Sequence, residues 1–128
     1  MQIKEITLEL MVKDVNESVA FYEKFFEFEL SLWEPEEGNL EWAKMQKGDF
    51  SLSFKLAQKV RKEVSIFSDK ETGGTLALCL QVEGSKELYE RLKDRVEVVN
   101  PPHLSACGLN EFSILDNNGY LITIDEVP

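Results

Sequence analysis

One pattern occurs twice in this chain, with the two copies separated by 70 residues. An alternating apolar strand, a turn and a short amphipathic helix occupy Ile6–Phe26, and a similar run occupies Leu76–Val96. In the first strand Leu8, Leu10 and Val12 are apolar at every second position, as Leu78, Leu80 and Val82 are in the second. Because the same unit repeats in so short a chain, the sequence predicts a duplicated βαβββ module.

Composition narrows the class of protein. A chain of 128 residues has the size of one domain and buries roughly two-thirds of its unfolded surface. The formal net charge of −10 repels phosphate backbones, so we expect no nucleic-acid partner. We also expect no membrane partner, because no apolar run approaches the roughly 20 residues that span a bilayer. The N-terminal sequence has no signal-peptide pattern, and the two cysteines do not form a disulfide framework, which favours a cytoplasmic location.

Periodicity and turn signals place the individual elements. Asp14 or Asn16 is expected to cap the first helix and Ser85 the second, and the Asp116–Gly119 turn is expected to join the last hairpin. The polar stretch Ala57–Gly74 predicts a linker, with Val64–Phe67 as a short extended piece. Strands are expected over Ile3–Val12, Phe28–Trp33, Leu40–Gln46, Phe50–Leu56, Thr75–Val82, Arg95–Val99 (ended by Pro101-Pro102), Glu111–Leu115 and Tyr120–Glu126, and helices over Val19–Phe26 and Ser85–Asp94.

Two motifs resemble those of a known family. The run Val12-Lys13-Asp14, followed by Ser18 and Phe21-Tyr22, resembles the V-x-D…S…FY opening of the vicinal oxygen chelate superfamily. Its members include glyoxalase I, extradiol dioxygenases and the bleomycin and fosfomycin resistance proteins. The segment from Gly108 through Phe112-Ser113-Ile114-Leu115-Asp116 to Gly119 is similar to that superfamily's closing motif, with Asn117 in place of the usual proline.

The resemblance implies an α+β fold. Two tandem βαβββ modules would form a curved, mostly antiparallel eight-stranded sheet around a cavity, with the helices outside. The whole chain, 1–128, would be a single domain, with module one at about 1–57, a linker at about 58–74 and module two at about 75–128. Members of this size usually form homodimers. The strand faces turned away from the helices would line the cavity with Thr7, Glu9, Met11, Ser51, Ser53, Lys55, Ala77, Cys79, Gln81, Leu121, Thr123 and Asp125.

Metal-dependent members of that superfamily hold a divalent ion with one His, Gln or Glu on each of four strands. The resemblance places these positions at Thr7, Ser53, Ala77 and Thr123. An alanine offers no donor, and a neutral hydroxyl is a poor ligand beside imidazole or carboxylate. We therefore predict no metal site and no cofactor, unless the ligand positions are assigned wrongly.

A cavity without a metal ion still suits a small-molecule ligand. Glu9 and Asp125 are candidates to hold a cationic group, and Trp33 and Trp42 are candidates to stack on a flat one. For Trp42 a place in the core, and for Trp33 a dimer contact, are the alternatives. Glu9 is also placed to pair with Lys55 across the sheet.

Three functions stay open at this point. The first is a metal-free binding protein of the glyoxalase/bleomycin resistance type that sequesters a cationic or aromatic ligand. The second is an enzyme, a lyase, isomerase or dioxygenase of the same superfamily with a non-standard site, whose weak catalytic candidates are Glu9, His103 and Asp125. The third is a regulatory or interaction module with a vestigial cavity. His103 is expected in an exposed loop, Cys107 in a loop beside the cavity, and Cys79 as a small buried filler.

Overall fold

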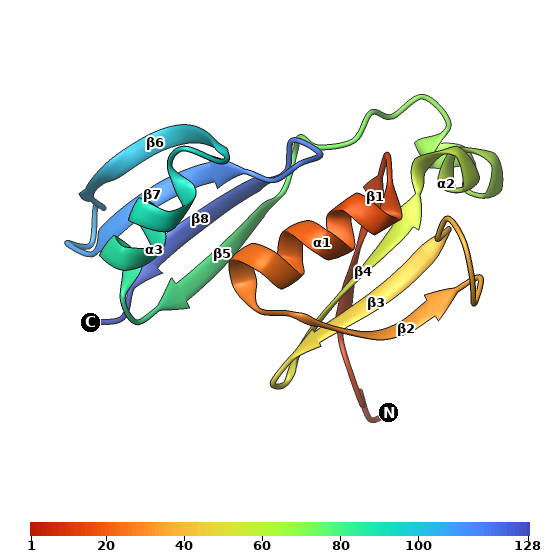
Figure 1. Cartoon of the computed structure of the whole chain (residues 1–128), viewed down its shortest axis with the longest axis horizontal. Helices are drawn as coiled ribbons and strands as arrows, with labels where there is room; N and C mark the ends of the chain where they lie inside the picture. Colours follow the sequence, from red (N-terminus) through yellow and green to blue (C-terminus); the bar gives the residue numbers. More distant parts are fainter. The chain divides into compact units, whose positions relative to one another are not determined.

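The computed structural model describes all residues from Met1 to Pro128 and divides the chain into two compact units, Met1–Thr72 and Gly73–Pro128. Each unit contains one four-stranded mixed sheet, so the α+β class is confirmed (Figure 1). No helix is long and apolar enough to cross a membrane. In chain order the elements are β1 (Thr7–Val12), α1 (Val15–Phe26), β2 (Glu29–Glu34), β3 (Trp42–Lys47), β4 (Phe50–Leu56), α2 (Ala57–Glu63), η1 (Ser65–Phe67), β5 (Ala77–Val82), α3 (Ser85–Leu92), β6 (Glu97–Leu104), β7 (Asn110–Leu115) and β8 (Leu121–Glu126).

The sheet of the first unit has the strand order β1-β4-β3-β2. β1 pairs parallel with β4, and the other neighbours are antiparallel. Helix α1 packs across one face of this sheet (Figure 1), where Tyr22 stacks on Phe54 with ring centroids 5.3 Å apart. Asp14 caps the helix by accepting a hydrogen bond from the backbone N–H of Glu17 at 2.9 Å. The opposite face of the sheet carries no helix contact from α1 and is built from the polar positions of the strands.

The second unit repeats this arrangement with the order β5-β8-β7-β6. β5 pairs parallel with β8, and α3 packs on β7 and β8, where Tyr89 meets Phe112 edge-on with centroids 5.1 Å apart. The final hairpin turns as expected, because Asp116 accepts hydrogen bonds from the backbone of Asn118 and Tyr120. Gly73 lies against this turn. A Cβ there would come within 2.8 Å of the carbonyl oxygen of Gly119, so no larger residue fits.

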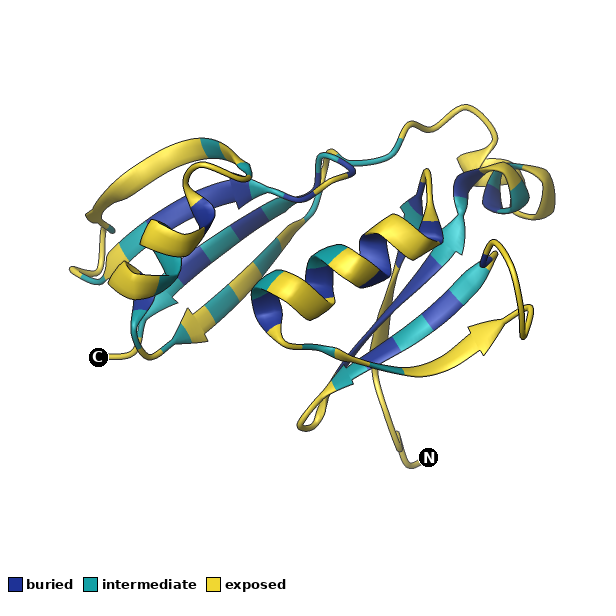
Figure 2. Cartoon of the chain, in the orientation of Figure 1, coloured by how far each residue is buried: buried dark blue, intermediate teal, exposed yellow.

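Burial alternates along β3 and β8, as the apolar pattern predicts (Figure 2). In β1 the apolar positions are buried only near the C-terminal end of the strand. Leu10 and Val12 are fully buried, whereas Ile6, just before the strand, is 78% exposed. The strand itself starts at Thr7, four residues later than expected, where its pairing with Ser51 of β4 begins.

β6 differs from the expectation. It continues through Pro101-Pro102 to Leu104 instead of ending before the prolines. A proline removes one backbone donor, which a central strand does not tolerate, but β6 is the edge strand of its sheet. Its register against β7 also shifts between Asn100 and His103, so the prolines fall within an irregularity of the ladder.

Two further expectations need correction. Most of α2 and the whole 3₁₀ turn η1 lie within the expected linker, so Val64–Phe67 is not an extended piece. Helix α3 begins at Ser85 and its N-cap is Gly84, which has no side chain to cap with. The missing acceptor comes from Glu126, whose carboxylate accepts from the N–H groups of Gly84 (3.2 Å) and Ser85 (3.3 Å).

Candidate ligand-binding site

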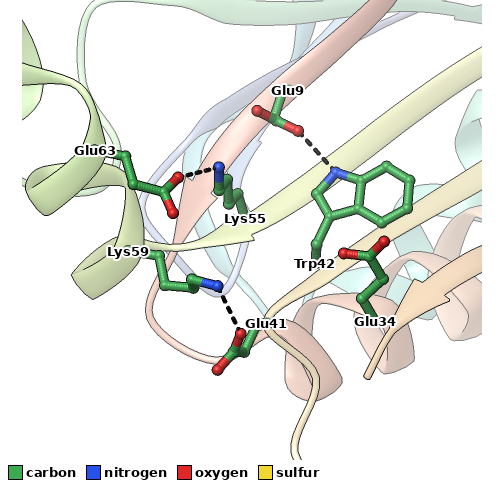
Figure 3. A pocket seen from close by; sticks show the side chains of 7 residues that line it. All are labelled: Glu9, Glu34, Glu41, Trp42, Lys55, Lys59 and Glu63. Atoms are coloured by element: carbon green, nitrogen blue, oxygen red, sulfur yellow. Dashed lines mark hydrogen bonds and ion pairs between the residues drawn. The ribbon is translucent and has the colours of Figure 1, made fainter. Parts of the chain in front are cut away.

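The candidate site is a pocket of about 370 Å³ in the first unit. It lies on the side of the sheet opposite α1, with α2 forming one wall. A pocket of this size falls in the range of about 300–1,000 Å³ in which small-molecule ligands bind. Figure 3 shows the side chains that line it: Glu9, Glu34, Glu41, Trp42, Lys55, Lys59 and Glu63.

Trp42 is the aromatic surface of the pocket, and Glu9 holds it in place. The indole Nε1–H donates to Glu9 Oε1 at 2.8 Å, and the hydroxyl of Ser53 donates to the same oxygen at 3.0 Å. The strand register explains why these three side chains lie together. Glu9 lies opposite Ser53 on β4, and Trp42 lies opposite Lys55, which is two residues after Ser53 on the same strand. The carboxylate therefore fixes the edge of the ring and leaves its faces unbonded.

Two ion pairs connect the pocket walls. Lys55 donates to Glu63 at 2.5 Å, which links β4 to α2, and Lys59 donates to Glu41 at 2.8 Å, which links α2 to the residue just before β3. The hydrogen bond from Lys55 lowers the pKa of the Glu63 carboxyl. The hydrogen bond to Glu41 raises the pKa of the Lys59 ammonium. Each pair therefore favours the charged form of the group whose pKa it shifts, the Glu63 carboxylate and the Lys59 ammonium.

The pocket has an excess of negative charge. Four carboxylates and two ammonium groups line it, which leaves a formal charge of −2. Glu34 lies directly opposite Trp42 in the β2–β3 ladder, and its side chain makes no hydrogen bond or ion pair (Figure 3). A carboxylate without a hydrogen bond or ion pair, next to an indole ring, is a suitable environment for a ligand with a positive charge on or near a flat ring.

The structure brings together three of the residues predicted for the first module: Glu9, Lys55 and Trp42. Glu9 does not pair with Lys55, because the lysine reaches Glu63 on α2 instead. Trp42 is half-buried and belongs to the pocket rather than to the core. Trp33 lies on the other face of the sheet, because it pairs with the buried Ala43, and its Nε1–H donates to the carbonyl of Glu36 at 3.3 Å.

The other predicted residues of the first module share the pocket face without lining the pocket. Thr7 and Ser51 are opposite each other and their hydroxyl oxygens lie 2.8 Å apart. Both also donate to Glu5, whose pKa is lowered mainly by its hydrogen bond from Lys44. Met11 lies opposite Lys55.

Sequence reasoning missed four of the lining residues. Glu34 stands at the start of the acidic run at Glu34–Glu37, and a run of like charges is by itself typical of a solvated surface. Glu41, Lys59 and Glu63 come from segments without clear periodicity. The spacing of four between Lys59 and Glu63 is a helical signal that could have placed them on one face of a helix.

In the second unit, strand register places the predicted residues on the sheet face opposite α3. Ala77, Cys79 and Gln81 on β5 lie opposite Leu121, Thr123 and Asp125 on β8. Cys79 is exposed, not a buried filler, because it belongs to this polar face. Thr123 shares a hydrogen bond of 3.1 Å with Ser113.

The remaining candidates of the second unit lie at its edge. His103 is exposed but belongs to strand β6 rather than a loop. Its Nδ1–H donates to the carbonyl of Pro101 at 2.8 Å, and its Nε2 lies 3.0 Å from the Glu111 carboxylate. Cys107 is exposed in the loop between β6 and β7, with its Sγ 3.2 Å from the Ser105 hydroxyl.

The resemblance assigns the superfamily's metal-ligand positions to Thr7, Ser53, Ala77 and Thr123, and each of these side chains is a poor ligand. Thr7, Ser53 and Thr123 engage their hydroxyls in hydrogen bonds with Glu5, Glu9 and Ser113, and Ala77 has no donor atom. No group of three or more His, Cys, Asp or Glu side chains is arranged to hold a metal ion. Carboxylate, imidazole and thiolate groups are the usual protein ligands of transition-metal ions, and these four side chains supply none of them.

Comparison with known proteins identifies the family. The profile of the Glyoxalase/Bleomycin resistance protein/Dioxygenase superfamily matches residues 2–124, nearly the whole chain. The chain therefore belongs to this superfamily, which confirms the resemblance read from the two sequence motifs. No curated protein matches the sequence at a significant level.

Solved structures share the fold at low sequence identity. The hypothetical protein SA1046 from S. aureus is 21% identical with a TM-score of 0.79, covering 99% of this chain and 96% of that chain. A superfamily member from Sphaerobacter thermophilus is 19% identical with a TM-score of 0.78, covering 99% of each chain. A glyoxalase-related enzyme from Fulvimarina pelagi is 24% identical with a TM-score of 0.75, covering 98% of this chain and 90% of that chain.

Proposed function

We propose that this chain is a metal-free binding protein of its superfamily that sequesters a small cationic aromatic molecule. The observation that carries the proposal is the arrangement around Trp42. An indole with its edge fixed by Glu9 lies beside the unpaired carboxylate of Glu34, in a pocket with a formal charge of −2. The pocket thus combines a stacking surface with an uncompensated charge of the sign that attracts cations.

In this proposal the flat part of the ligand stacks on Trp42 while its positive charge lies near Glu34. Stacking orients the ligand, and the carboxylate selects for charge. Glu9 is a positioning residue, because its carboxylate is already used by the indole and by Ser53. No step of catalysis is required of these residues, and none of them is a nucleophile with an adjacent base.

Ethidium, a planar cation, is a suitable probe, and 1-anilinonaphthalene-8-sulfonate, an aromatic anion, is its counterpart. A ligand that binds the native state raises the midpoint of thermal unfolding. We expect ethidium to raise the midpoint of the wild-type protein and the sulfonate to leave it unchanged. The rise should be lost in Trp42→Ala and kept in Trp33→Ala. Equal shifts by both probes, or a shift that survives Trp42→Ala, would contradict the proposal.

A further inference from the structure

The side chain of Lys59 connects two walls of the pocket. It comes from α2 and donates to Glu41 at the start of β3 (Figure 3). Glu63 follows four residues later and therefore lies on the same face of the helix. Lys62, on the same helix, is exposed and does not line the pocket.

The ammonium group of Lys59 lies in the field of several pocket carboxylates. After its hydrogen bond with Glu41, the charges of Glu41, Glu63 and Glu34 also raise its pKa. Lys55 differs from Lys59, because it comes from strand β4 and is paired with Glu63. Lys59 is thus the pocket cation that the carboxylates of both walls share.

We propose that Lys59 is an internal counter-ion of the pocket, which competes with a cationic ligand for the pocket carboxylates and is displaced from Glu41 when the ligand binds. This inference rests on the proposed function, since it names how the same site regulates access to its ligand. The displaced ammonium is on a side chain that is 43% exposed, so it can move into water at small cost. Glu41 then becomes available to the ligand, and the two pocket walls are no longer linked through this pair.

Mutation of a pocket residue usually weakens binding, but the counter-ion role predicts the opposite for Lys59. Removing the Lys59 charge should tighten the binding of a cation, because the internal competitor is gone and Glu41 is unpaired. We expect Lys59→Gln to lower the Kd for ethidium by roughly two- to fivefold, the scale set by partly exposed charge pairs. Lys59→Arg keeps the competing charge and should therefore lower the Kd less than Lys59→Gln does.

Lys62→Gln is the matched control, because it removes the same charge from the same helix outside the pocket. Its Kd should change less than about twofold, the effect of a distant screened charge. In a Glu41→Gln background the further change Lys59→Gln should bring a smaller gain, since the pair that it releases no longer exists. Thermal unfolding midpoints of all variants establish that each is folded.

The outcomes separate the two proposals. If wild type and Lys59→Gln both fail to bind ethidium while folded, the proposed function is wrong. If wild type binds but Lys59→Gln binds no more tightly than Lys62→Gln, the pocket binds cations and the counter-ion role of Lys59 is wrong. An undiminished gain in the Glu41→Gln background would also overturn that role.

Discussion

The indole N–H of Trp42 donates to the Glu9 carboxylate at 2.8 Å and so joins β3 to β1 across the intervening strand β4. Because Ser53 on β4 donates to the same oxygen, three strands meet at a single carboxylate. This bond orients the one aromatic ring of the pocket. The pairing of the three strands therefore fixes the position of the Trp42 ring through this bond.

Loss of Glu9 should loosen the ring and weaken binding of a flat cation. Glu9→Gln keeps an oxygen that accepts from the indole, so it should lose less ethidium affinity than Glu9→Ala, which removes the partner altogether. The steady-state fluorescence anisotropy of Trp42, measured in a Trp33→Phe background, should fall in Glu9→Ala. Glu37→Gln, an exposed acidic residue outside the pocket, is the control for net charge. Equal affinities of the two Glu9 variants would show that charge alone matters.

The core beneath the sheet depends on Phe54, which is completely buried against Tyr22. Phe54→Ala should lower the free energy of unfolding by about 3–5 kcal/mol, the usual range for a buried phenylalanine. Phe50, on the same strand, is 75% exposed, so Phe50→Ala should change the stability little. Urea unfolding followed by circular dichroism measures both. A large loss in Phe50→Ala would mean that this side chain is covered in solution.

The cap of α1 depends on a single side-chain acceptor, Asp14. Asp14→Ala should cost about 1 kcal/mol of stability, because the N–H of Glu17 loses its partner. Asp14→Asn should retain most of the stability, since asparagine is an equally good cap. Urea midpoints compare the three proteins. Similar losses in both variants would indicate that the charge of Asp14, not the hydrogen bond, is what stabilises the helix.

His103 should carry a proton to higher pH than an ordinary histidine. Its Nδ1–H donates to the Pro101 carbonyl, and its Nε2 faces the Glu111 carboxylate; both partners only accept, so only the imidazolium satisfies both. These contacts, the Pro101 carbonyl first, raise the pKa of His103 above 6.5. Because the pKa of His103 is higher in the folded than in the unfolded protein, its contacts stabilise the fold fully at pH values below the unfolded-state pKa. This stabilisation is lost as the pH rises through the folded-state pKa.

The expected result is visible by NMR, because His103 is the only histidine of the chain. Its imidazole resonance should titrate above the unfolded reference, and Glu111→Gln should bring the midpoint down. The unfolding midpoint of His103→Gln should fall below that of the wild type at pH 5.5 and approach it in alkaline solution. A titration of His103 at or below the unfolded value would refute this interpretation.

The repeat made the fold predictable. The offset of 70 read from the strand pattern also relates the first residues of α1 and α3, Val15 and Ser85. Alternation placed Glu9, Lys55 and their neighbours on the face away from α1, as observed. Alternation did not place Trp33 correctly, because the register of β2 shifts between Leu30 and Leu32. Beyond this shift each side chain lies on the face of the sheet opposite to the one that strict alternation predicts.

The pocket was less accessible to sequence reasoning. Lys59 and Glu63 meet Glu41 and Lys55 only through the packing of α2 on β4, which no local pattern encodes. The path of β6 through two prolines is likewise set by its place at the edge of the sheet. Local chemistry predicted the cap at Asp14 and the turn at Asp116, where neighbours in sequence supply the partners.

The quenching of Trp42 fluorescence is the most direct test of the binding site. In Trp33→Phe protein all indole emission comes from Trp42, because the chain has two tryptophans. Titration with ethidium should quench this emission saturably, and Glu34→Gln should weaken the apparent affinity, whereas Glu37→Gln should not. An unquenched Trp42 at ethidium concentrations that raise the thermal midpoint would show that the cation binds elsewhere, and the assignment of this pocket would be wrong.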